Sequence, residues 1–69
     1  MLTADKITDE MARDVLAECE RRIRRGEAKQ GDRDLAAACR QAVYAADVRD
    51  GGRNRVAEIL NARAKAGVG

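Results

Sequence analysis

The 69-residue sequence contains no histidine, proline, phenylalanine or tryptophan, a single tyrosine and only two cysteines. Without histidine, a zinc site would have to be completed by carboxylates, and there is no Cys-x-x-Cys pair. No nucleophile motif or phosphate-binding glycine loop is present either. Without large aromatic side chains, a hydrophobic core has little area to bury. We therefore predict that the protein is not an enzyme and has no metal site and no cofactor.

Long apolar runs are also missing, which bears on location. The longest, residues 35–39, is far too short to span a bilayer. No secretion signal is apparent, so we expect a cytoplasmic protein that does not enter a membrane. Cys19 and Cys39 fall on apolar faces of predicted helices. Cytosolic thiols stay reduced, so free buried thiols are favoured over a disulfide between the first two helices.

Positive and negative side chains are nearly balanced. Fourteen Lys and Arg residues oppose twelve Asp and Glu residues, which gives a net charge of +2. A domain that binds phosphate groups is usually more basic. Alanine and arginine dominate the composition, which fits a GC-rich genome such as that of a bacterium or its phage.

What the chain does contain is helical periodicity. A first amphipathic helix is predicted from the N-cap Thr8 to the terminating Gly26, and a second from the N-cap Asp32 to Asp50, closed by residues 51–52. A third runs roughly over residues 54–66. We predict an all-α fold of two to three short amphipathic helices, as a helical hairpin or a three-helix bundle. Residues 1–7 would form an N-terminal extension, 8–66 one helical domain, and 67–69 a frayed end.

The second predicted helix has two apolar stripes. One consists of Leu35, Cys39, Ala42, Val43 and Ala46, and the other, on nearly the opposite side, of Ala37, Tyr44 and Val48 with Gln41 between them. A helix of a small protein usually needs one such stripe. The second needs cover, either from another helix of the chain or from another molecule. We favour another molecule, in a homodimer, because alanine-rich faces supply little area within one chain.

Four residues are the candidates for self-association or for docking on a partner: Ala37, Tyr44, Val48 and Arg63. Arg63 lies within the apolar face of the third helix, where it either extends its charge to solvent, anchors an interface or forms an ion pair. The leading hypothesis is a small non-enzymatic protein-interaction module, such as a regulator, adaptor or inhibitor, with a larger protein partner.

Basic residues support an alternative. The candidates for polar or phosphate contacts are Arg21, Arg22, Arg24, Arg25, Arg53 and Arg55. They are compatible with a small nucleic-acid-binding accessory or a transcriptional regulator.

The segment 51–60 also resembles the opening helix of the Fis-type helix-turn-helix. The matching positions are Gly51, Arg53, Ala57, Glu58 and Leu60. The resemblance implies a glycine turn and then a DNA-reading helix, but Asn61 stands where the turn glycine belongs. It covers one short segment and assigns the chain to no family.

Overall fold

Three α-helices and two short 3-10 turns make up the structure, a computed structural model that describes residues 1–67. In chain order the elements are η1 (Ala4–Lys6), α1 (Asp9–Arg24), α2 (Gln30–Tyr44), η2 (Ala46–Val48) and α3 (Arg49–Gly67). No strand occurs in this part of the chain. The prediction of an all-α fold is confirmed. The predicted frayed end falls largely on residues 68–69, which lie outside the described part.

Helix α1 begins and ends where local chemistry predicts. The side-chain oxygen of Thr8 accepts a hydrogen bond from the backbone N–H of Met11 at 3.1 Å. At the other end Gly26 adopts a φ of +72°, a conformation that costs glycine little. The N–H groups of Gly26 and Glu27 donate to the carbonyls of Ile23 and Arg22, which satisfies the last turn.

Helix α2 starts two residues before the predicted N-cap, so the assignment of Asp32 as N-cap is wrong. The N-cap is Lys29, and Asp32 lies at the third helical position. Its carboxylate reaches back and accepts a hydrogen bond from the backbone N–H of Lys29 at 3.1 Å. Asp32 therefore still satisfies a free N–H at the start of the helix, from a position inside it.

The predicted end of the second helix is also wrong. The chain turns at Ala45 and η2, and Gly51 and Gly52 lie inside α3. The reason is a close contact between α2 and α3. A Cβ atom at Gly52 would lie 2.5 Å from the backbone nitrogen of Ala42, so only glycine fits there. This tertiary contact outweighs the roughly 1 kcal/mol that glycine costs a helix.

Helix α3 is consequently longer than the predicted segment 54–66. It runs from Arg49 without a break through Asn61 to Gly67. The turn implied after Leu60 by the helix-turn-helix resemblance is not formed. The described residues contain no further helix after α3 that could read DNA.

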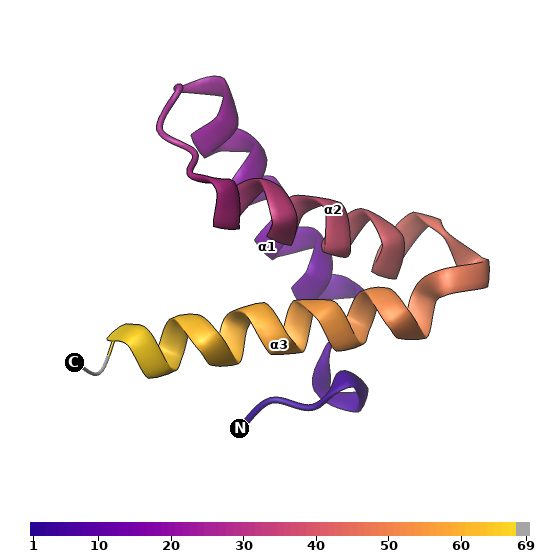
Figure 1. Cartoon of the computed structure of the whole chain (residues 1–69). Helices are drawn as coiled ribbons and strands as arrows, with labels where there is room; N and C mark the ends of the chain where they lie inside the picture. Colours follow the sequence, from indigo (N-terminus) through magenta and orange to yellow (C-terminus); the bar gives the residue numbers. More distant parts are fainter. Residues whose placement is uncertain (68–69) are drawn as a thin grey trace.

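Helix α2 is the centre of the fold and packs against both α1 and α3 (Figure 1). Helices α2 and α3 run antiparallel, while α1 crosses behind α2 in this view. The core is made mostly of small side chains: Ile7, Ala12, Leu16, Cys19, Leu35, Ala36, Ala38, Cys39, Ala42, Val43, Val56 and Ala57. Five alanines among these twelve allow close helix approach but bury little area per residue.

The N-terminal segment is part of this packed unit. The side-chain amide of Asn61 makes two hydrogen bonds with the backbone of Leu2, each 2.8 Å long. Ile7 is completely buried, and η1 lies against α3 (Figure 1). Residues 1–7, which the sequence suggested as an extension, thus cover one side of α3.

Candidate interaction surface

A groove runs along the surface between α2 and α3, and we call it the α2–α3 groove. Its lining residues are Asp34, Ala37, Ala38 and Gln41 from α2, with Val48, Gly51 and Arg55 from η2 and α3. Ala37 and Ala38 lie three and four residues after Asp34, and Gln41 lies four and three residues after them, so the four residues share one face of the helix. Gly51 and Arg55 are four apart and share a face of α3 in the same way.

The side chains that line the middle of this groove are small. Ala37, Ala38 and Gly51 place at most a methyl group between the two helices at this surface. No atom lies within 4 Å of the position that a Cβ of Gly51 would take, so the space above it is open. Such a surface allows a neighbouring helix to approach the backbone closely.

Two exposed apolar side chains lie near the end of the groove where the chain turns from α2 into α3. Tyr44, the last residue of α2, is 72% exposed, and Val48 is 46% exposed. Tyr44 follows Gln41 by three residues and so continues the same face of α2. Because α2 ends at Tyr44, Val48 does not belong to a stripe on that helix as predicted. The structure nevertheless brings Val48 into the same groove as Ala37.

The two sides of the groove carry opposite charges. Asp34 belongs to α2 and Arg55 to α3. Asp34 accepts a hydrogen bond from the side chain of Gln30 at 3.0 Å, and Arg55 pairs with Glu58 at 3.3 Å. Both contacts are solvent-exposed, and exposed ion pairs contribute only about 0.2–1 kcal/mol. Asp34 and Arg55 can therefore exchange these contacts for others at little cost.

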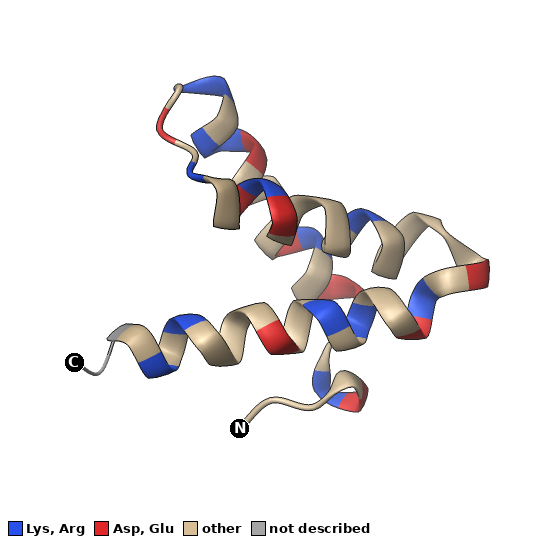
Figure 2. Cartoon of the chain, viewed as in Figure 1, with Lys and Arg blue, Asp and Glu red and all other residues tan. Residues whose placement is uncertain are grey.

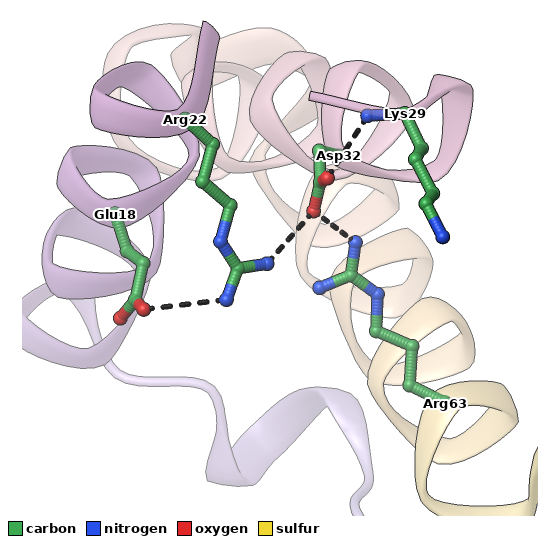
Figure 3. A network of polar contacts seen from close by, with 5 residues as sticks. All are labelled: Glu18, Arg22, Lys29, Asp32 and Arg63. Atoms are coloured by element: carbon green, nitrogen blue, oxygen red, sulfur yellow. Dashed lines mark hydrogen bonds and ion pairs between the residues drawn. The ribbon is translucent and has the colours of Figure 1, made fainter. Parts of the chain in front are cut away.

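Arg63 belongs to a polar cluster that joins all three helices (Figure 3). Its guanidinium donates to Oδ1 of Asp32, which also accepts from Arg22 at 3.1 Å, while Arg22 contacts Glu18 at 3.4 Å. The Asp32 residue is only 5% exposed. The ion pair explains why an arginine occupies the apolar face of α3.

Hydrogen bonds determine the acidity of Asp32. The N–H of Lys29, then the guanidinium of Arg63, and to a smaller extent that of Arg22 lower the pKa of Asp32 from 3.8 to about 2. The carboxylate is therefore charged at neutral pH, and it holds α1 and α3 to the start of α2. The position of Arg63 on an apolar helix face suggested an ion pair as one possibility. Its partner could not be identified from the sequence, because Arg63 and Asp32 are far apart along the chain.

The remaining candidate arginines fall into two groups. Arg53 pairs with Asp9 at 2.9 Å, and Arg22 and Arg55 take part in the contacts above. The other three, Arg21, Arg24 and Arg25, form an exposed basic end of α1, visible at the top of Figure 2. They make no salt bridge with any residue of the described part. Half of the predicted phosphate contacts are thus engaged within the chain.

The cysteines lie in the core between α1 and α2 as free thiols. Burial raises the pKa of the Cys39 thiol to about 11, and burial also raises the pKa of Cys19. Thiols with such pKa values hold few thiolate ions at neutral pH and react slowly. Over residues 1–67 no three Cys, Asp or Glu side chains gather where they could hold a metal ion.

Comparisons with protein-family models, with curated proteins and with solved structures find no match to this chain. The helices of the described part include none with the length and apolar character needed to cross a bilayer.

Proposed function

We propose that this protein is a small non-enzymatic interaction module that docks the α2–α3 groove against another protein chain and so acts as a regulator, adaptor or inhibitor. The observation that carries the proposal is the exposure of two apolar side chains. Tyr44 is 72% exposed, and the half-exposed Val48 lines the groove. Tyrosine is the chain's sole aromatic residue, and the fold leaves it outside the core. Rigid amphipathic tyrosines are enriched among the residues that dominate binding energy.

The exposed area of the chain supports the same proposal. The chain exposes 4839 Å² to solvent. The scaling of surface with mass gives about 4,200 Å² for a compact monomer of 7.5 kDa. The excess of roughly 600 Å² approaches the approximately 800 Å² that each partner buries in a typical specific interface.

The test is capture of partners from cells that make the protein, with Tyr44→Asp as the variant. Because Tyr44 is mostly exposed, this change should alter the free energy of unfolding by less than about 0.5 kcal/mol. It should nevertheless abolish the capture of any partner that binds the groove, because a charge would enter a dry interface.

Ile23→Asp is the matched control, since Ile23 is also an exposed large apolar residue, at 38%, but lies at the far end of α1. It should retain the partners of the wild type. Retention of the same partners by Tyr44→Asp would show that the groove is not the docking surface.

A second candidate function is that of a nucleic-acid-binding accessory or transcriptional regulator. The observation in its favour is the basic end of α1, where Arg21, Arg24 and Arg25 remain free of salt bridges within residues 1–67. Such contacts predict binding that weakens steeply with salt. Electrophoretic mobility shifts at low salt test it, and an unshifted nucleic acid would remove it. The near balance of charge over the whole chain makes it the weaker candidate.

A further inference from the structure

We infer that a cavity between α1 and α3 binds a small carboxylate whose apolar body has about six carbon atoms, the size of benzoate. The cavity has a volume of about 190 Å³. An apolar cavity of about 150 Å³ is large enough to bind benzene, so one ring fits here. This carboxylate cavity shares no lining residue with the α2–α3 groove, and the inference therefore goes beyond the proposed function.

The carboxylate cavity has apolar walls and an apolar base. Helices α1 and α3 both pack on α2 but make few contacts with each other, which leaves space between them. Leu35 of α2, only 1% exposed, lines the base. Val15 and Cys19 of α1 line one wall and Leu60 of α3 lines the other. An apolar ring that enters this space would remain in contact with carbon and sulfur atoms on three sides.

Both walls change from apolar to cationic in the same direction along the cavity. On α1, Arg22 follows Val15 by seven residues on the same face, and on α3, Arg63 follows Leu60 by three. The two arginines meet at the start of α2, where both contact Asp32 (Figure 3). The carboxylate cavity thus has an apolar end and a cationic end, which matches a molecule with an apolar body and one acidic group.

The cationic end has positive charge to spare. Arg22 and Arg63 donate to the same oxygen of Asp32, so one buried carboxylate serves two guanidiniums. Both arginine side chains remain partly exposed, at 44% and 39%, and each guanidinium has further N–H donors. The second positive charge is met by Glu18, at 3.4 Å from Arg22 and 58% exposed. Such exposed pairs contribute little, so a ligand carboxylate can replace Glu18 at Arg22.

Titration of the whole chain with sodium benzoate, followed by amide chemical shifts, tests the site. Benzoate should cause saturable shifts in the segments of α1 and α3 that line the cavity, with a millimolar dissociation constant, as expected for so small a ligand. Acetate has the same acidic group without the ring, and benzyl alcohol has the ring without the charge. Each should bind at least about tenfold more weakly than benzoate, because each uses only one end of the cavity.

Two variants connect the binding to the named residues. Glu18→Gln removes the competing carboxylate and should tighten benzoate binding by about threefold. Glu20→Gln is the matched control, since it makes the same change of charge on α1 at an exposed residue that pairs with Arg40 and does not line the cavity. It should leave the dissociation constant unchanged. Val15→Phe, which fills the space with a ring of the chain's own, should weaken benzoate binding by about tenfold or more.

Several results would overturn the inference. Equal binding of acetate and benzoate means that the arginines hold an adventitious ion only, and equal binding of benzyl alcohol means that they do not recognise the charge. Absence of saturable shifts with benzoate excludes the site, and so do equal effects of Glu18→Gln and Glu20→Gln. Should Val15→Phe not keep its helical circular dichroism, the glutamate pair still decides. None of these outcomes bears on the α2–α3 groove, which the comparison of Tyr44→Asp with Ile23→Asp tests independently.

Discussion

The neighbouring glycines at the start of α3 should respond to alanine in opposite directions. At Gly51 an added Cβ meets no atom within 4 Å. Gly51→Ala should therefore raise the free energy of unfolding by about 0.5–1 kcal/mol, because alanine favours the helix and restricts the unfolded chain. At Gly52 the same methyl group would lie 2.5 Å from the backbone nitrogen of Ala42 and 2.9 Å from the carbonyl carbon of Gln41.

The size of the second effect follows from this overlap. Non-bonded heavy atoms prefer separations of about 3.5–4.0 Å, so α2 and α3 would have to move apart by roughly 1 Å. No rotamer change relieves the overlap, since the nearest atom is backbone. Overpacking of this kind costs about 1–3 kcal/mol, and the gain in helix propensity offsets up to about 1 kcal/mol of it. Gly52→Ala should thus lower the free energy of unfolding by about 1–2 kcal/mol and the Tm by about 4–16 °C.

Urea unfolding followed by far-UV circular dichroism measures both variants against the wild type. The comparison is made at several protein concentrations, because Gly51 lines the α2–α3 groove and self-association would add to apparent stability. A Gly52→Ala protein at least as stable as Gly51→Ala would refute the close approach of α2 and α3, and with it the position of the groove.

Two further predictions concern buried ionisable groups. The pKa of Asp32 is about 2 in the folded chain against an ordinary 3.8, so the unfolded chain binds the proton more readily. The free energy of unfolding should therefore fall by roughly 2 kcal/mol as the pH drops from about 4 to about 2. In the Asp32→Asn variant, the free energy of unfolding measured over the same pH range should lack that part of the loss. The Cys39 pKa of about 11, against a reference of 9.0, means about a hundredfold less thiolate near neutral pH. A thiol reagent should therefore label Cys39 at least about a hundredfold more slowly in the folded protein than in urea. Fast labelling of Cys39 without denaturant would place its thiol outside the core.

The start and end of α1 could be predicted from the sequence because their determinants are local. A threonine oxygen three residues from an N–H, or a glycine in a positive φ, acts within one turn of the chain. The same holds for the all-α class, which follows from helical periodicity without proline. Ala37 and Val48 both line the groove, but not from one helix as predicted, since Val48 reaches the groove from the connection between two helices.

The glycine pair shows where such local reasoning stops. Two consecutive glycines end a helix when only chain entropy acts on them. Here Gly52 is instead the point at which another helix touches the backbone, and the contact keeps α3 helical. No residue near Gly52 in the sequence indicates that Ala42 will lie against it. Asp32 differs from its predicted role for a related reason, because two arginines from distant helices draw its carboxylate into the interior.

By itself the sequence determined that this chain is helical, where its first helix begins and ends, and that its aromatic and apolar content is too small for a large core. Those properties depend on composition and on contacts within one helical turn. Only the tertiary structure decided that Gly52 joins two helices, that Arg63 neutralises a buried aspartate, and that Asp34 and Arg55 line the same groove. Those outcomes depend on which distant residues share space, and that is fixed when all three helices pack together.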